Sequence, residues 1–170
     1  TGEANYVPID PCQPLIMGLR IATQEGIVRK YIDWSCDNYE SRKVDFPDTY
    51  ALRHMTYEKF CAALLLTIKR PITGSLHDKR ARWMAFQLHQ LEMDFSKITI
   101  ICSILDWPWI KEAYDERKPY VKPNGRIKNP KIYGVKKETL FFALTEFPYI
   151  TYLNEKYRQE MISDKEVAID

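Results

Sequence analysis

The chain has 170 residues, of which 45% are hydrophobic and 28% are charged, a composition typical of a folded domain that can bury a core. Its 25 basic and 23 acidic side chains leave a formal net charge of only +2. No apolar run approaches the roughly 18 residues of a membrane-spanning helix, and the first residues lack the basic and apolar segments of a secretion signal, so we expect no transmembrane segment and no export signal.

The first fourteen residues are predicted to form an extended arm. Three prolines fix the backbone angle φ there and remove amide donors, namely Pro8, Pro11 and Pro14. Apolar residues then recur at steps of three and four from Leu15 to Ile32, although two glycines weaken the pattern. One interrupted helix or two short helices would fit this spacing.

The next helix is predicted between Thr56 and Pro71, after a polar connection at residues 41–48. Threonine is a residue that caps helix N-termini, and the proline prevents the helix from continuing. An apolar stripe and apolar flanks favour a central helix. The stripe is Phe60, Cys61, Leu64, Leu65 and Ile68, and the flanks are Ala62, Ala63 and Leu66.

The clearest helical pattern follows a turn at Gly74 and Ser75. Ser75 and Asp78 have the spacing at which a cap and the third helical residue satisfy free amides reciprocally. Trp83 and Phe86 widen the apolar stripe of this helix. The stripe itself is Ala81, Met84, Ala85, Leu88, Leu91 and Phe95.

The second half of the chain predicts several shorter helices. Residues 96–105 are favoured as a helix, although the β-branched run 98–101 would equally suit a buried strand. Asp106 is expected to cap a helix that continues through Arg117. One further helix should end near Pro148 and a last one should run through residues 150–161, before a frayed tail at 164–170. The fold class is therefore all-α, a bundle of six or seven helices in a single domain over residues 15–163.

Cysteine and histidine patterns argue against a metal site and against an enzyme. Cys12, Cys36, Cys61 and Cys102 are widely spaced and contain no CxxC pair, so free thiols in a reducing intracellular compartment are favoured, although two disulfides would be possible in an exported protein. Phosphate-binding glycine loops and nucleophile motifs are absent from the sequence. We therefore expect no catalytic residues, no metal and no cofactor.

The charge of the chain is concentrated in residues 117–137, which we call the basic stretch. It contains eight cations and no acid, so the rest of the chain is net acidic. Cations that are not neutralised by neighbouring acids can bind a phosphate backbone. These cations are Arg117, Lys118, Lys122, Arg126, Lys128, Lys131, Lys136 and Lys137.

Other residues of the basic stretch fit a contact with unpaired bases. Tyr120 and Tyr133 lie among the cations, where their rings could stack on bases. Prolines restrict the stretch, and Asn124 and Gly125 favour a β-hairpin turn. A second basic group flanks the turn at residues 71–75 and would form the other wall of a groove if the fold brings the two groups together. This group is Lys69, Arg70, Lys79, Arg80 and Arg82.

The sequence thus predicts a non-enzymatic nucleic-acid-binding protein, with RNA favoured over DNA, of the self-assembling nucleoprotein, coat or matrix type. Lysines and tyrosines in a loop suit backbone tracking and stacking better than readout of a duplex groove. The alternative is a protein-interaction or scaffold module whose basic stretch docks on an acidic partner or another subunit. A weaker alternative is a helix-turn-helix that starts at residues 101–107, in which Glu112, Asp115 and Glu116 would be repelled by phosphate.

Overall fold

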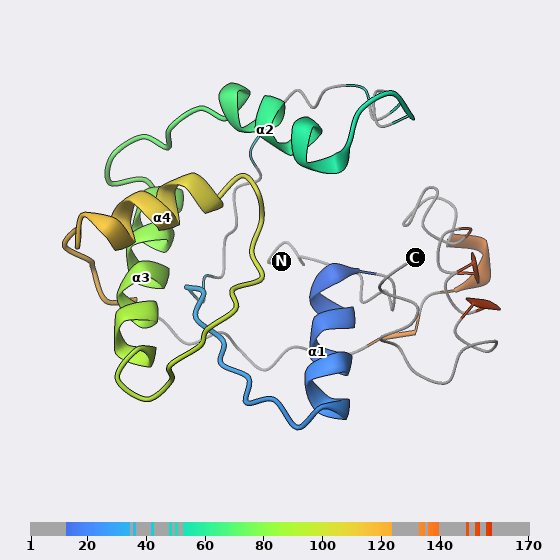
Figure 1. The fold of residues 1–170 in the computed structure, drawn as a ribbon, viewed down its shortest axis with the longest axis horizontal. Coiled ribbons are helices and arrows are strands. Elements are labelled where there is room, and N and C mark those ends of the chain that lie inside the picture. The colour runs from blue at the N-terminus through green and yellow to red at the C-terminus, as the bar shows by residue number, and fades with distance from the viewer. Residues whose placement is uncertain are drawn as a thin grey trace, which may run out of the picture. The chain divides into compact units, whose positions relative to one another are not determined.

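A computed structural model describes residues 13–34 and 53–123, single residues at 36, 42, 48 and 50, and parts of the segment from 133 to 157. Two compact units are distinguished: residues Thr1–Lys30 with Lys131–Asp170, and residues Tyr31–Pro130. Within the described residues there are four α-helices and no strand, which confirms the all-helical class (Figure 1). The predicted N-terminal arm lies outside the described residues, except that Pro14 is already helical.

Helix α1, Pro14–Gln24, belongs to the first unit and begins with its proline, whose missing amide proton costs nothing at that position. The helix ends at Gln24, and two residues later Gly26 has a φ of 66° in the left-handed region that glycine adopts most easily. The amide of Ile27 donates to the carbonyl of Ala22 at 2.8 Å, and that of Gly26 donates to Thr23 at 3.4 Å. This pair of bonds is the Schellman motif that closes helix C-termini.

Helix formation was also predicted for residues 27–32, and that prediction is wrong. Gly26 turns the chain out of the helical direction, and residues 27–32 have no regular secondary structure. The apolar spacing there has another cause, because Ile32 packs against the core of the second unit while Tyr31 is exposed.

Helix α2, Tyr57–Thr67, has the predicted cap: the Thr56 hydroxyl accepts a hydrogen bond from the amide of Lys59 at 3.5 Å. The prediction of a central helix is wrong, since α2 buries only one face. Phe60 and Leu64 are buried there, as is Ile68 just beyond the helix end. The predicted flanks, Ala62, Ala63 and Leu66, are exposed.

Helix α3, Leu76–Leu91, confirms the clearest pattern of the sequence as far as Leu91, whereas Phe95, the last residue of the predicted stripe, lies beyond the helix end. The Ser75 hydroxyl accepts from the amide of Asp78 at 3.4 Å, as a helix cap does. The Asp78 carboxylate accepts from the amide of Gly74 at 2.8 Å, one residue before the position that a capping box would use. The helix starts where predicted because both side chains satisfy amides that have no partner within the helix.

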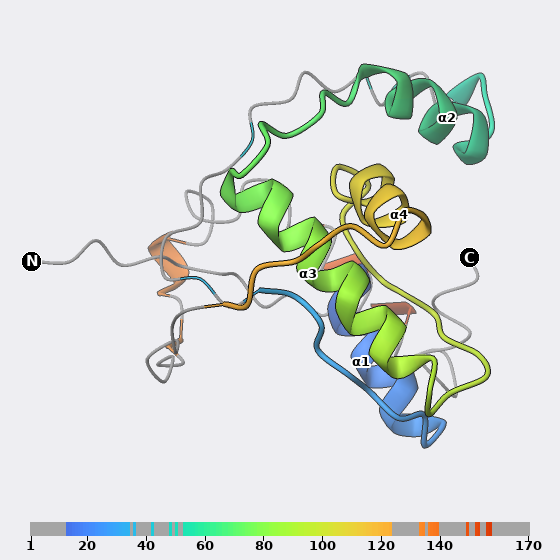
Figure 2. The same cartoon turned by 90° about the vertical axis from the view of Figure 1, so that its left-hand side faces the viewer.

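Helix α4, Trp107–Asp115, packs against α3, and both views show the two helices side by side (Figures 1 and 2). Ile110 of α4 is fully buried and forms a core cluster with Ala81 and Met84 of α3. Partly buried side chains surround this cluster, namely Ile32, Leu88, Ile100, Cys102 and Trp109. The core of the second unit therefore lies between α3 and α4.

Residues 96–103 form neither the predicted helix nor the alternative strand, so both expectations are wrong. Ile100 and Cys102 are partly buried and reach the α3–α4 core, whereas Ile98 and Ile101 are more exposed. Residues 104–106 form a turn in which the amide of Asp106 donates to Ser103 at 2.9 Å. The helix-turn-helix alternative is also wrong, because its first helix would need these residues.

The end of α4 is closed by a second Schellman motif. The amide of Lys118 donates to the carbonyl of Ala113 at 3.0 Å, and that of Arg117 donates to Tyr114 at 3.3 Å. Arg117 adopts the left-handed conformation, with a φ of 48°, at a position where glycine is usually found. The helix therefore ends at Asp115, two residues before the predicted end.

Arg117 is expected to destabilise this helix end, because a β-carbon is crowded in the left-handed region. We expect Arg117→Gly to raise the free energy of unfolding by about 0.5–1 kcal/mol. Arg117→Ala is the control, since it removes the charge but keeps the β-carbon. Urea denaturation monitored by circular dichroism measures both variants, and a glycine variant no more stable than the alanine variant would contradict the assignment.

Candidate nucleic-acid interface

The first part of the basic stretch is described as far as Pro123. Arg117 and Lys122 are exposed, and neither forms an ion pair with a residue that the structure describes. Pro119, three residues before Lys122, and Pro123, directly after it, each have a fixed backbone angle φ. Two cations of this part are therefore available at the surface.

The later part of the basic stretch is described only at a few positions. Tyr133, Lys136 and Lys137 are exposed, and Lys137 begins a short 3-10 helix, η2, Lys137–Thr139. The carbonyl of Lys136 accepts from the amide of Thr139 at 2.9 Å. Arg126, Lys128, Lys131 and the predicted hairpin turn at residues 124–125 lie outside the described residues, so the hairpin stays a prediction.

Among the described cations of the basic stretch, Lys118 is the one that forms ion pairs with acids of the same chain. Its ammonium group forms an ion pair with the carboxylate of Glu112 and lies 3.3 Å from that of Glu116. Partial burial, together with the positive charges of Arg70 and Arg82, lowers the pKa of Lys118. The guanidinium groups of Arg70 and Arg82 therefore lie close enough to the Lys118 ammonium group to repel it.

The second basic group reaches the first at this point. Arg70 binds Glu112 through two hydrogen bonds, one of 2.8 Å, and its guanidinium lies 4.8 Å from the centre of the Trp109 ring. Arg82 pairs with Asp78 at 3.1 Å and donates to the carbonyl of Pro119 at 3.5 Å. The fold thus brings two members of the second group beside the start of the basic stretch.

The other members of the second group lie in different surroundings. Arg80 is buried, with its guanidinium bound to Asp33 at 2.6 Å and lying 3.6 Å from Asp106. Lys69 is exposed and Lys79 is half-buried, and neither forms an ion pair among the described residues. Arg80 therefore links elements of the second unit and is not presented to solvent.

The two tyrosines also differ. The Tyr120 ring is stacked on Phe86 of α3 with a centroid distance of 3.7 Å and an interplanar angle of 18°, and Trp83 lies 5.8 Å away. Tyr133 is 68% exposed and makes no ring contact with a described residue. One face of Tyr120 is thus already covered, whereas the ring of Tyr133 is open to a stacking partner.

Sequence reasoning missed the acids that face these cations. Asp78 could have been found, because it lies four residues before Arg82 on the same helix face. Glu112 could not, because it is 42 residues away from Arg70 and no local pattern joins them. Phe86 was assigned to the stripe of α3, but its stacking on Tyr120 also depends on a long-range contact.

Two structural findings and three comparisons bear on function. No group of three or more metal-ligating side chains occurs within the described residues, and none of the described helices is both long and apolar enough to cross a bilayer. Comparison with protein-family models, with curated proteins and with solved structures found no match.

Proposed function

We propose that the protein is a non-enzymatic, helical nucleic-acid-binding protein that uses the basic stretch as its contact surface. The observation that carries the proposal is the segregation of charge: eight cations and no acid lie within residues 117–137. Arg117 and Lys122 support it, because they are exposed and form no ion pair among the described residues. A polyanion is the partner that such a segment attracts most strongly.

The cations around Lys118 suggest where a phosphate would bind. Burial, and after it the charges of Arg70 and Arg82, lowers the pKa of Lys118. A phosphate placed beside these three cations would replace their mutual repulsion with attraction. It would compete with Glu112, which now holds both Arg70 and Lys118. Binding at this point should therefore be weaker than at Arg117 and Lys122, which pair with no carboxylate in the part of the chain that the structure describes.

Single-stranded RNA is the favoured ligand. The exposed ring of Tyr133 offers a surface on which an unpaired base can stack, a contact worth about 1–3 kcal/mol per base. Duplex readout requires a helix or ribbon in the major groove, and the exposed residues of α4 near the stretch include the acids Asp115 and Glu116. We further propose the finer features expected from the sequence: six or seven helices, and a self-assembling nucleoprotein, coat or matrix-type role.

Charge reversal at four positions of the basic stretch tests the proposal. We expect Lys122→Glu, Arg126→Glu, Lys128→Glu and Lys131→Glu together to weaken binding of labelled single-stranded RNA by at least about 100-fold, measured by fluorescence anisotropy. The loss follows because four attractive contacts become repulsive.

The matched control reverses four exposed cations outside the basic stretch and the second basic group, so its net charge equals that of the test variant. It consists of Lys30→Glu, Arg53→Glu, Lys59→Glu and Lys97→Glu. The control should bind within about tenfold of the parent, since only the unspecific net-charge effect remains. Equal losses in both variants would refute the assignment of the contact surface.

A protein-interaction or scaffold module is the second candidate, and one observation favours it. Leu66 on α2 and Ile72 in the following turn are 89% and 82% exposed, the largest exposed fractions among the large hydrophobic side chains that the structure describes. Exposed apolar side chains that form a patch mark protein interaction sites. Light scattering separates the two functions. The scaffold function would be favoured over the first proposal if the parent forms oligomers but does not bind RNA, and if the charge-reversed variant no longer forms these oligomers.

A further inference from the structure

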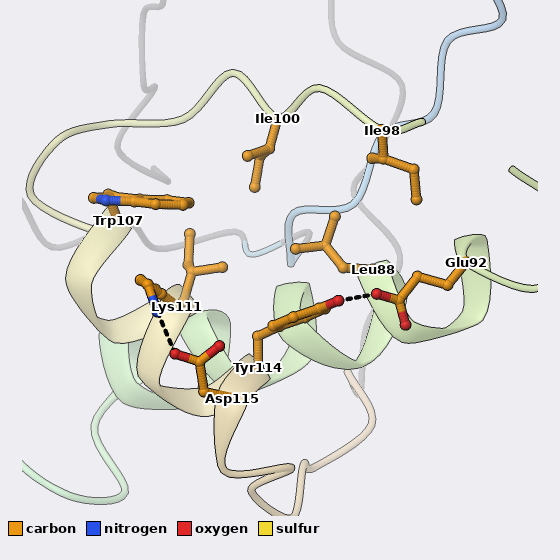
Figure 3. Close-up of a pocket in the computed structure, with 9 residues that line it drawn as sticks. Leu88, Glu92, Ile98, Ile100, Trp107, Lys111, Tyr114 and Asp115 are labelled. Atoms are coloured by element: carbon orange, nitrogen blue, oxygen red, sulfur yellow. Dashed lines mark hydrogen bonds and ion pairs between the residues drawn. The ribbon is translucent and has the colours of Figure 1, made fainter. Parts of the chain in front are cut away.

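A pocket of about 240 Å³ opens between the end of α3, one face of α4 along its whole length and residues 98–100 (Figure 3). Its apolar lining comes from four aliphatic side chains: Leu88, Ile98, Ile100 and Ile110. No lining residue belongs to the basic stretch, so the proposed nucleic-acid contact does not account for the pocket. The size suits a small ligand or a single side chain and is below the roughly 300 Å³ of common drug-sized sites.

Two aromatic rings on one face of α4 border this pocket. Trp107 and Tyr114 are seven residues apart, two helical turns along the same face. Trp107 is 38% exposed, so part of its ring is accessible, and Figure 3 shows it at one end of the pocket. The faces of tryptophan and tyrosine rings attract cations that come within about 6 Å. One face of the Tyr114 ring is covered by the His89 ring, which is stacked on it with a centroid distance of 4.3 Å, so only its other face can contact a ligand.

The rim of the pocket carries more negative than positive charge. Glu92 and Asp115 contribute two carboxylates and Lys111 one ammonium group, which pairs with Asp115. The Tyr114 hydroxyl donates to one oxygen of Glu92, and Nδ1 of His89 lies 3.2 Å from the other. A carboxylate has about four acceptor positions, so Glu92 retains capacity for a further donor.

We propose that this pocket binds an organic ammonium ion with an apolar body. Its apolar part would fill the space between the aliphatic side chains, and its charged end would lie at the rim beside Glu92 and Tyr114, at the end of the pocket opposite Trp107. An anionic ligand of the same shape would be repelled by Glu92 and Asp115. A neutral one would gain only the apolar contacts.

Three ligands of one shape and different charge test the proposal on the full chain. Phenethylamine, which is an ammonium ion at pH 7, 2-phenylethanol and phenylacetate are titrated in turn into the ¹⁵N-labelled protein. We expect saturable shifts of the amide signals of residues 98–115 with phenethylamine, about tenfold weaker binding of the alcohol, and no saturable shifts with the acid. Equal affinities for all three, or no binding of the amine, would overturn the proposal.

A double variant identifies the carboxylates responsible. Glu92→Gln with Asp115→Asn should weaken amine binding about tenfold while leaving binding of the alcohol unchanged, which also reports that the pocket is still folded. The control, Asp94→Asn with Glu138→Gln, removes two exposed acids that do not line the pocket. Loss of amine affinity in the control alone would overturn the assignment.

The same ammonium chemistry could come from a free amine or from a lysine side chain of a peptide. Titration of N-acetyl-lysine methylamide distinguishes these two sources. Binding as tight as that of phenethylamine would support the proposal with a peptide as the source. Weaker binding than phenethylamine would support it with a free amine as the source.

Discussion

Replacing Asp106 by alanine should lower the free energy of unfolding by about 3 kcal/mol or more, the largest effect that we expect from a single substitution. The Asp106 carboxylate is buried, pairs with the Arg42 guanidinium and lies 3.6 Å from that of Arg80. Its side chain is 7% exposed and that of Arg80 is 8% exposed. The variant would leave the buried Arg80 and the partly buried Arg42 without the carboxylate that they share.

Two controls separate this effect from a general loss of charge. Asp33→Ala removes the other carboxylate bound to Arg80, but Asp33 is about half exposed, so we expect a loss of about 1 kcal/mol. Asp106→Asn keeps the shape and removes the charge, and it should be nearly as harmful as alanine. Urea denaturation measures all three variants. An Asp106→Ala loss no larger than that of Asp33→Ala would show that the buried pairs do not hold the second unit together.

Local sequence signals were sufficient to predict the helices that begin at caps. Thr56 and Ser75 satisfy amides of the first turn by short-range hydrogen bonds, and both helices begin at the predicted residue. The start of α4 was also predicted correctly at Asp106, but for an incomplete reason. Its carboxylate makes no capping bond and instead takes part in the ion pairs with the two arginines.

Periodicity failed where apolar residues pack without being helical. Ile100 and Cys102 reach the α3–α4 core from an irregular segment, and their burial gives the segment an apolar pattern that imitates a helix or a strand. The helix prediction for residues 27–32 failed for a different reason, because the left-handed conformation of Gly26 ends α1 before them. A glycine inside an apolar pattern was treated as a weakness when it was in fact the helix end.

The candidate interface was predictable in composition but not in pairing. The concentration of cations in residues 117–137 is evident in the sequence. Ion pairs such as Arg70 with Glu112 and Arg80 with Asp33 join residues more than 40 positions apart, so they depend on the fold alone. Arg82 approaches Lys118 because α3 packs against α4, whereas Arg70 approaches it through its contacts with Glu112 and Trp109 of α4.

The second large effect that we expect is a steep dependence of RNA affinity on salt concentration. Each phosphate that a cation neutralises on a single strand contributes about −0.7 to the slope of log K against log salt concentration. If all eight cations of the basic stretch take part, the slope should be about −5.6, so affinity should fall about 2,000-fold between about 50 mM and about 200 mM salt. This steepness would distinguish phosphate contacts from binding by apolar contact, which salt does not weaken.

The most direct test of the central claim is the slope measured for the parent and for the variant reversed at Lys122, Arg126, Lys128 and Lys131. Fluorescence anisotropy with one mixed-sequence single-stranded RNA provides both values. A slope of about −5.6 for the parent and a shallower slope for the variant, about −3 where binding is still measurable, is the result that we predict. Absence of binding by the parent at about 50 mM salt, or equal slopes for the two proteins, would contradict the claim that this stretch binds nucleic acid.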